Sequence, residues 1–376
     1  MKNHVVLQLD PTPRNARNSE ATFITLESGR ILLAWSKFTS GNNADHGAGV
    51  IAARHSEDGG QTWSQRDRVL VQQEGTTNVM SPSFLRLQDG RIALLYLRKD
   101  ENNLCMPYIR FSDDECKTFS DPVQVIQAPG YYVVNNDRMI QLENGRLMIP
   151  VSMHRMRGPS EMKSTDGSTA GASLQPFFAS PAMIFYYFSD DGGQTWLESL
   201  TSYYLCSPSG HGLQEPGVIE LNGGKLWSWS RAGAFGLQGQ NGHQWQSFSE
   251  DGGQVWSQPQ PSQFISPCSP MHVKRIPSTG HLLAIWNDHS GRFKTPKPKA
   301  SSWGRTPLVS AISKDEGQTW EHHKLLEKAP DHGFCYPAIH FVGQAVLLSY
   351  CAGGASSDIC LDTLRVRWMP LDEMYV

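Results

Sequence analysis

The feature that most constrains the fold is a short turn-and-strand unit that the chain repeats six times. Each copy places a glycine shortly before an apolar run, as in residues 89–96, Asp-Gly-Arg-Ile-Ala-Leu-Leu-Tyr. Glycine tolerates a positive φ at no steric cost, so Asp-Gly or Asn-Gly between apolar runs predicts a tight hairpin. The repeat glycines are Gly29, Gly90, Gly145, Gly224, Gly280 and Gly343.

A second motif, Ser-x-Asp-x-Gly-x-Thr-Trp, alternates with the first and is called the Asp box below. Regular copies begin at Ser56, Ser189 and Ser313, and altered copies begin at Ser112 and Ser249. The Asp side chain can accept hydrogen bonds from the amides of its own turn, the glycine supplies a left-handed residue, and the tryptophan packs back on the strands. Each unit then has room for a second hairpin, which makes four strands.

Six units of four strands predict an all-β fold, a six-bladed β-propeller with Asp-box turns, in which residues 1–376 form one domain. Radial repetition of this kind avoids open sheet edges. The last unit lacks an Asp box and closes with residues 363–368, so we expect residues 5–9 to complete it from the other end of the chain. Residues 155–181, rich in Gly, Ser, Met and Pro, are expected to form a loop over one face.

Composition limits the classes of partner. The chain has 33 basic and 36 acidic residues, a balance that argues against nucleic acid or an anionic membrane as a partner. No apolar run reaches 18 residues and the first ten residues do not resemble a signal peptide, so we expect a cytoplasmic protein without a transmembrane helix. The seven cysteines form no CxxC pair and the histidines lack metal-ligand spacing, which predicts reduced thiols and neither a metal nor a cofactor.

The residues between the repeats carry a more specific signal. Glu215 precedes a repeat glycine, and Arg231 follows 16 residues after it, at the end of the next strand. Arg305 lies a few residues before an Asp box, and Tyr336 opens the strand that leads to the last repeat glycine. In these residues, their order and their spacing, the chain resembles the bacterial sialidase (neuraminidase) superfamily over essentially its whole length.

The resemblance implies a central site in which three arginines hold the substrate carboxylate. It implies that Tyr336 is the nucleophile, that Glu215 is the base beside it, and that Arg231 and Arg305 are two of the three arginines. The acid/base aspartate of the family lies on the loop between the first repeat strand and the first Asp box, and Asp45 occupies that place.

The first arginine departs from the family pattern. Sialidases have Arg-Ile-Pro there, whereas this chain has Pro-Arg-Asn-Ala-Arg-Asn-Ser-Glu over residues 13–20. We assign Arg17 to this role and keep Arg14 as the alternative. Glu20 has no counterpart in the family; pointing inward, it would repel a carboxylate or pair with one of the arginines. This departure leaves the identity of the sugar open.

Polar residues also gather just before the third repeat glycine, over residues 130–138. The starts of inner strands ring the centre of a propeller, so we expect Asn136 and Arg138 to line the pocket. The alternative is that Asn135 and Asn136 only cap a bulge.

The chemistry of a 2-keto sugar acid explains why these residue types would occur together. Its carboxylate would repel a carboxylate nucleophile, so a neutral tyrosine that loses its proton to a glutamate suits the reaction. The sequence therefore predicts a sialidase-like retaining exo-glycosidase that releases a terminal α-linked acidic sugar from a glycan. Two alternatives stay open: a hydrolase or lyase acting on uronic-acid-containing polysaccharide, and a propeller that binds glycan without catalysis. Linkage and oligomeric state are not readable from the sequence.

Overall fold

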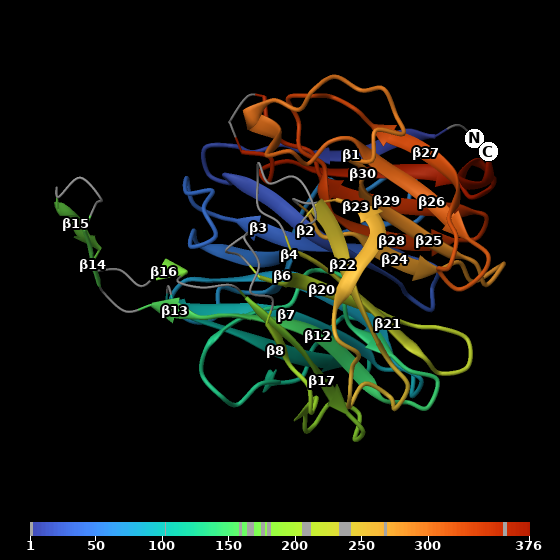
Figure 1. Cartoon of the computed structure of the whole chain (residues 1–376). Coiled ribbons are helices and arrows are strands. Elements are labelled where there is room, and N and C mark those ends of the chain that lie inside the picture. Colours follow the sequence, from blue (N-terminus) through green and yellow to red (C-terminus); the bar gives the residue numbers. More distant parts are fainter. Residues whose placement is uncertain are drawn as a thin grey trace.

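The computed structural model describes the chain except for residues 1–2, 102, 158–159, 164–168, 174–176, 179–181, 205–211, 233–241, 267–268 and 356–358. The described part is all-β (Figure 1), with short 3-10 helices at Ala300–Ser302 and Asp372–Tyr375. About half of the predicted 155–181 loop lies outside the described residues. Its described backbone forms two short antiparallel pairs, β13 (Met156–Arg157) with β16 (Phe177–Phe178) and β14 (Ser160–Lys163) with β15 (Thr169–Ser173).

The other strands form successive antiparallel groups, and the first three groups make up one fourteen-stranded sheet. Single parallel contacts, Gly49 with Asn78 and Cys105 with Tyr131, join these three groups. The first group is β2 (Arg17–Thr25), β3 (Ile31–Phe38), β4 (Gly49–Ser56) and β5 (Arg68–Val71). The second is β6 (Asn78–Arg86), β7 (Ile92–Glu101), β8 (Leu104–Ser112) and β9 (Val123–Gln124). The third is β10 (Tyr131–Val133), β11 (Ile140–Gln141), β12 (Leu147–His154), β17 (Met183–Ser189), β18 (Leu197–Glu198) and β19 (Tyr203–Tyr204).

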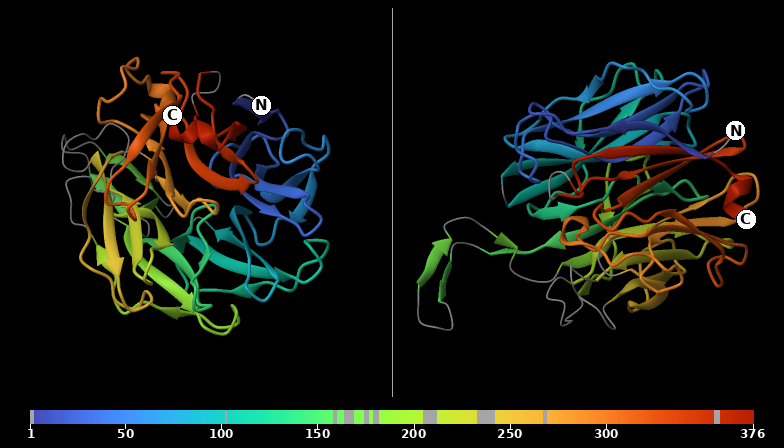
Figure 2. Two further views of the ribbon diagram at one scale, coloured as in Figure 1. Left: turned by 90° about the vertical axis from the view of Figure 1, so that its right-hand side faces the viewer. Right: turned by 90° about the horizontal axis from the view of Figure 1, so that it is seen from above.

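Three separate four-stranded sheets follow. One is β20 (Gln214–Glu220), β21 (Leu226–Arg231), β22 (His243–Ser249) and β23 (Gln260–Ile265), and the next is β24 (His272–Arg275), β25 (Leu282–Asn287), β26 (Leu308–Ser313) and β27 (Glu321–Glu327). The last is β28 (Cys335–Val342), β29 (Ala345–Cys351), β30 (Leu364–Pro370) and β1 (His4–Leu9). The pairing of β1 with β30 confirms that the N-terminal segment completes the last sheet. The left panel of Figure 2 shows the groups arranged around a common centre, with the two termini close together.

The core lies between neighbouring groups rather than inside one. Strand β3 is buried on both faces, with the indole of Trp35 fully enclosed, because a neighbouring group packs against each side. One apolar cluster joins Trp35 and Phe23 of the first group to Leu347 and Val366 of the last. Continuous apolar runs therefore follow the repeat glycines, since neither face of these strands meets water.

The Asp boxes form the predicted self-contained turns. In the first box Asp58 accepts hydrogen bonds from the amide of Thr62 at 2.9 Å and from its hydroxyl at 2.7 Å, and Gly60 has a φ of +89°. The tryptophans pack against the preceding group as well as their own. Trp63 lies in the cluster that contains Leu347, and the ring of Trp256 stacks on that of Tyr186 with 3.7 Å between centroids. The boxes thus stabilise the contact between groups.

Candidate active site

One backbone feature recurs at the start of the inner strands. In five groups a non-glycine residue there has a positive φ, and β2, β6, β20 and β28 have a register shift at the same place. Such a conformation costs about 1–3 kcal/mol and is concentrated at functional sites, and a bulge re-aims the side chain. The residues are Glu20 (55°), Ser81 (56°), Asp137 (60°), Glu215 (53°) and Tyr336 (54°).

Two of these residues meet directly. The Tyr336 hydroxyl donates a hydrogen bond to Glu215 Oε1 at 2.6 Å, and both residues are buried. Nε of Arg231, the last residue of β21, forms a hydrogen-bonded ion pair with the other oxygen, Glu215 Oε2. The guanidinium of Arg305 lies 5.1 Å from the centre of the Tyr336 ring. Four of the predicted residues, from three sheets, therefore form one connected cluster.

The charges in this cluster set its protonation. Burial would raise the pKa of Glu215, but the charge and hydrogen bond of Arg231 outweigh burial, so the pKa of Glu215 lies below its ordinary value. Burial, followed by the nearby carboxylate of Glu215, raises the pKa of Tyr336 well above its ordinary value. The resting pair is thus a neutral phenol that donates to a carboxylate. This is the arrangement that proton transfer from the phenol to Glu215 requires.

Arg305 is held beside Tyr336 by the segment before β26. Its Nη1 donates to the sulfur of Cys335 at 3.2 Å, and its guanidinium lies 5.5 Å from the centre of the Trp303 ring. The Nε of Arg305 has no hydrogen-bond partner in the described part of the chain. Arg305 makes no ion pair with a described carboxylate, which leaves its charge available to an anion.

The remaining predicted residues form a second cluster on the first group. Arg17 is fully buried, whereas Arg14 is exposed, so the structure places Arg17 rather than Arg14 toward the centre. Nη1 of Arg17 contacts Asp45 Oδ1 at 2.5 Å, and Nη2 contacts Glu20 Oε1 at 3.4 Å. Glu20 does point inward and pairs with an arginine, one of the two outcomes predicted for it. Glu20 also accepts hydrogen bonds from the hydroxyls of Ser36 and Ser81.

Asp45 is held against this cluster by its backbone as well as by its side chain. Its carbonyl accepts hydrogen bonds from the Asn78 amide at 2.9 Å and from Lys99 Nζ at 3.0 Å, while about half of its side chain is exposed. Desolvation would raise the pKa of Asp45, but the charge of Arg17, followed by that of Lys99, lowers it well below its ordinary value. Burial, in contrast, raises the pKa of Glu20.

Asn136 and Arg138 lie at the centre, but their hydrogen bonds go to the protein. The Asn136 amide donates to the carbonyls of Ala21 at 2.7 Å and Tyr336 at 3.3 Å. Arg138 donates to the carbonyl of Met271 at 2.8 Å and contacts Nδ1 of His272. Asn136 Oδ1 and Arg138 Nε have no hydrogen-bond partner among the described residues.

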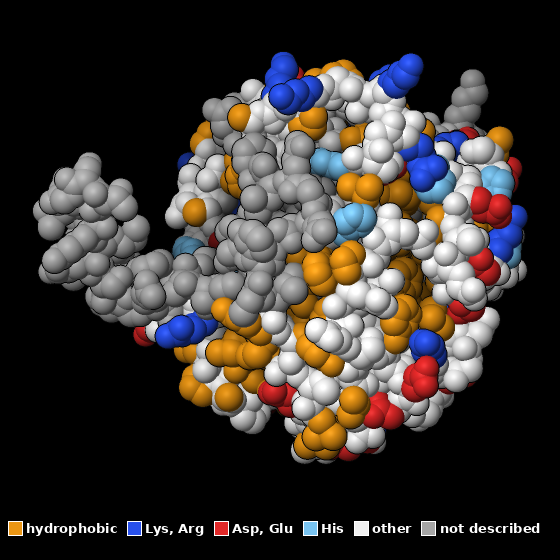
Figure 3. Space-filling model, in the orientation of Figure 1, with side chains coloured by type: hydrophobic (Ala, Val, Ile, Leu, Met, Phe, Trp, Pro, Cys, Tyr) orange, Lys and Arg blue, Asp and Glu red, His pale blue; other side chains and the backbone are white. Residues whose placement is uncertain are grey.

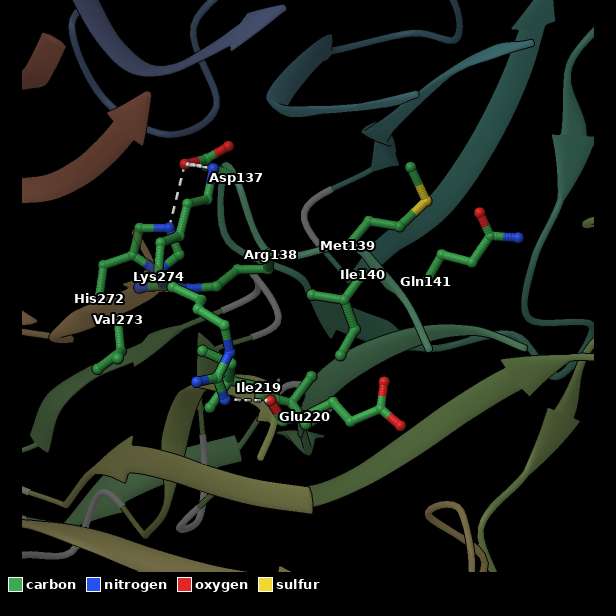
Figure 4. Close-up of a pocket in the computed structure, with 12 residues that line it drawn as sticks. Asp137, Arg138, Met139, Ile140, Gln141, Ile219, Glu220, His272, Val273 and Lys274 are labelled. Atoms are coloured by element: carbon green, nitrogen blue, oxygen red, sulfur yellow. Dashed lines mark hydrogen bonds and ion pairs between the residues drawn. The ribbon is translucent and has the colours of Figure 1, made fainter. Parts of the chain in front are cut away.

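Arg138 also borders a cavity of about 230 Å³ between the inner strands of the third, fourth and fifth groups. In Figure 4, Asp137, His272 and Lys274 lie together at one end of this cavity, away from Gln141. Its lining residues lie on the inner strands, on the side toward the repeat glycines. Neither Tyr336 nor Glu215 lines this cavity.

The sequence reasoning missed three buried polar residues of the centre: Ser81, Lys99 and Asp137. A usable signal existed for the first, because Ser81 precedes its repeat glycine by nine residues, as Glu20 and Glu215 do. Asp137 precedes its glycine by eight residues, and the pocket was assigned from the sequence to its neighbours Asn136 and Arg138 instead. Lys99, on β7, had no repeat-based signal.

Among the described residues, no group of three or more His, Cys, Asp or Glu could hold a metal ion, and no helix is long and apolar enough to cross a membrane. On the face shown in Figure 3, basic and acidic side chains are both spread over the surface, in keeping with the formal net charge of -3.

Comparison with known proteins decides the family. A family model described as a BNR repeat-like domain matches residues 29–347. The chain belongs to the BNR repeat-like family. No curated protein matches its sequence significantly.

Solved structures with the same fold include sialidases. An intramolecular trans-sialidase from Ruminococcus gnavus superimposes with a TM-score of 0.67 at 13% identity, covering 99% of this chain and 98% of that one. A Hadza microbial sialidase gives a TM-score of 0.67 at 16% identity, covering 98% of this chain and 68% of that one. A protein of unknown function from Dyadobacter fermentans gives 0.69 at 17% identity, covering 98% and 99%. These matches confirm the sialidase-superfamily fold, which is that of a β-propeller.

Proposed function

We propose that this protein is a six-bladed β-propeller and a sialidase-like retaining exo-glycosidase that releases a terminal α-linked acidic sugar from a glycan. The blade count rests on reading each strand group as one blade, with β1 completing the sixth. The observation that carries the function is the buried hydrogen bond between Tyr336 and Glu215, flanked by Arg231 and Arg305.

The charge around the centre supports an acidic substrate. In the cluster around Tyr336, the two guanidinium groups of Arg231 and Arg305 face the single carboxylate of Glu215, so this cluster carries a net positive charge that an anion would neutralise.

The two clusters give the substrate an orientation. Arg17 already contacts two carboxylates, Glu20 and Asp45, whereas Arg305 contacts none in the described part. The substrate carboxylate therefore fits best against Arg305 and Arg231, next to Tyr336. The guanidinium fork suits paired hydrogen bonds to a carboxylate and keeps its charge at all relevant pH values.

The reaction then follows from the protonation states. Glu215 takes the phenolic proton as the Tyr336 oxygen attacks the anomeric carbon, and Asp45, once protonated, donates a proton to the leaving oxygen. In the second step Asp45 deprotonates a water that displaces Tyr336, so the configuration is retained.

Substitution of the pair tests this proposal. We expect Glu215→Gln to lower the turnover of a fluorogenic α-ketoside of sialic acid, or of another α-linked acidic sugar, by about 10²–10⁴-fold, because the general base is lost. We expect Tyr336→Phe to lower it at least as much. Full turnover by Tyr336→Phe would exclude the mechanism.

The chain offers a matched control for both variants. Buried Tyr350 donates to the partly buried Glu327 at 2.7 Å, a second tyrosine–glutamate pair outside the two site clusters. Tyr350→Phe and Glu327→Gln should leave turnover within about threefold of the parent, because a pair outside the active site affects the stability of the fold rather than the reaction.

A second candidate function is supported by Glu20. Glu20 lies at the left-handed position of the first blade and accepts hydrogen bonds from two serines. A substrate hydroxyl can donate a hydrogen bond to such a carboxylate, whereas a substrate carboxylate would be repelled by it. A hydrolase or lyase acting on uronic-acid-containing polysaccharide would fit it, and ultraviolet absorbance of an unsaturated uronate product would reveal the lyase. Calorimetric binding of an acidic sugar without turnover at any pH would instead support a non-catalytic glycan-binding propeller.

A further inference from the structure

One side-chain amide connects the backbones of two left-handed bulges. Both hydrogens of Asn136 Nδ2 have acceptors: the carbonyl of Ala21, which follows Glu20, and the carbonyl of Tyr336 itself. Two carbonyls face this nitrogen, so its identity as the donor is fixed by the surroundings. Asn136 is almost completely buried, which makes each of these hydrogen bonds costly to lose.

The next residue extends the connection to other blades. Asp137 Oδ1 accepts from the Thr22 hydroxyl at 3.0 Å, and Asp137 Oδ2 accepts from the amide of Ile339 at 3.2 Å, three residues after Tyr336. Oδ2 also contacts His272 Nε2 at 3.0 Å and Lys274 Nζ at 2.7 Å. The Asp137 carboxylate thus contacts the inner strands β2, β24 and β28. The backbone amide of Asp137 donates to the carbonyl of Pro82 in β6.

The protonation of this network is consistent with a fixed role. Burial, and then the charge of Arg138, lowers the pKa of His272 to about 3, so the imidazole is neutral. It can then donate from Nε2 to Asp137 and accept at Nδ1 from Arg138. Four protein groups already contact the Asp137 carboxylate, three of them at Oδ2, so the protein holds this side chain in place.

We infer that Asn136 and Asp137 are positioning residues that hold the strained bulge of Tyr336 in line with Glu215; this inference rests on the proposed role of Tyr336. The amide of Asn136 fixes the carbonyl of Tyr336, and the carboxylate of Asp137 fixes the backbone at Ile339. Together they fix the backbone of the nucleophile at the bulge and directly after it. Asn136 therefore acts through Tyr336, without contact to the substrate.

Kinetics of Asn136 variants test the inference. We expect Asn136→Ala and the isosteric Asn136→Asp, which has no N–H donor, to lower kcat by about 10–100-fold while KM changes less than about threefold, because a small misplacement of a reacting group costs mainly the chemical step. In a Tyr336→Phe background, Asn136→Ala should cause no additional loss.

A spectroscopic readout makes the test independent of any substrate. The ultraviolet titration of the parent minus that of Tyr336→Phe reports the phenol of Tyr336, whose pKa lies well above its ordinary value beside Glu215. In Asn136→Ala this pKa should fall as the hydrogen bond to Glu215 loosens, while burial keeps it above its ordinary value. If Tyr336→Phe keeps full turnover, the proposed mechanism fails, and the titration still decides whether Asn136 positions the phenol.

The adjacent Asn135 supplies the matched control. It is the same residue type and buried, but its amide nitrogen has no hydrogen-bond partner in the described part of the chain. Asn135→Ala should leave kcat and the Tyr336 titration near the parent values, with circular dichroism and thermal melting confirming the fold of each variant. A folded Asn136→Ala protein with unchanged kcat and an unchanged Tyr336 titration overturns the inference.

Discussion

Arg231 controls the protonation of Glu215, and this contact gives a prediction at the scale of single residues. Burial would raise the pKa of Glu215, but the charge and hydrogen bond of Arg231, together with Arg305 and the Tyr336 hydroxyl, lower it below its ordinary value, so Glu215 is ionised at all but acidic pH. A base with a lowered pKa loses activity only when the pH falls through that pKa. In Arg231→Met burial is no longer outweighed, so we expect the acid limb of the kcat profile to move up by about one pH unit or more.

Arg367 gives the control for this measurement. Its Nη2 contacts Glu327 at 2.8 Å, so Arg367→Met removes a comparable ion pair away from the site. Its profile should keep the acid limb of the parent. An unchanged limb in Arg231→Met at saturating substrate would show that Glu215 is not the titrating base.

In its resting state Asp45 can accept a proton but cannot donate one. Contact with Arg17 keeps its pKa low and therefore keeps Asp45 charged at neutral pH. A charged Asp45 can accept a proton from water, as the proposed second step requires. To donate a proton in the first step, Asp45 must separate from Arg17 and take up a proton.

At the scale of single elements, one Asp box lacks a threonine hydroxyl that the regular boxes have. In the regular boxes a threonine hydroxyl donates to the Asp at 2.6–2.7 Å, as Thr62, Thr195 and Thr319 do. The box that begins at Ser249 has Val255 at this position, and its methyl groups are half-exposed. Threonine has the same shape, so we expect Val255→Thr to raise the free energy of unfolding by about 0.5–1 kcal/mol through a new hydrogen bond to Asp251.

The opposite substitution tests the same hydrogen bond. Thr195→Val removes the hydroxyl that donates to Asp191, and it should lower the free energy of unfolding by a similar amount. Urea unfolding of both variants beside the parent gives the comparison. A Val255→Thr protein no more stable than the parent would mean that the backbone amides alone saturate the Asp.

The elements that could be predicted from sequence are those whose contacts are local. An Asp box closes within eight residues, and the pairing of β1 with β30 follows from one unit that lacked a strand. The candidate pair could be predicted because its order and spacing match a known family, and the structure confirms that the side chains of Tyr336 and Glu215 are hydrogen-bonded. Whether this pair is catalytic stays a prediction.

The roles of Asn136 and Asp137 could not be predicted in the same way. Asn136 meets Tyr336, 200 residues further along the chain, and Asp137 meets Ile339 across 202 residues. Such contacts depend on the register of several inner strands at once, which no local pattern encodes. The packing of the Asp-box tryptophans against the preceding group has the same origin, because it depends on how neighbouring groups stack.

At the scale of the whole molecule, the two ends of the chain meet in one sheet. Strand β1 pairs with β30, and the apolar cluster beside them joins the first and last groups. Without β1, strand β30 would expose a row of unpaired backbone groups at a sheet edge, a template for association with other chains. Closure by the N-terminal strand thus stabilises the entire ring of groups rather than one hairpin.

A disulfide across this closure should make its contribution measurable. Gln8 lies opposite Arg365, and the Gln8 side chain accepts hydrogen bonds from that arginine at 3.1 and 3.0 Å, so the two side chains share one face of the sheet. We expect the oxidised Gln8→Cys/Arg365→Cys protein to be more stable than its reduced form by up to about 5 kcal/mol, because the bond closes nearly the whole chain into one loop. Denaturant unfolding with and without reductant gives the difference.

The out-of-register pair Gln8→Cys/Arg367→Cys should gain no stability on oxidation, because its cysteines are offset by two residues along the strand. Equal stability of the oxidised and reduced in-register protein would show that β1 separates from β30 only after the rest of the molecule has unfolded.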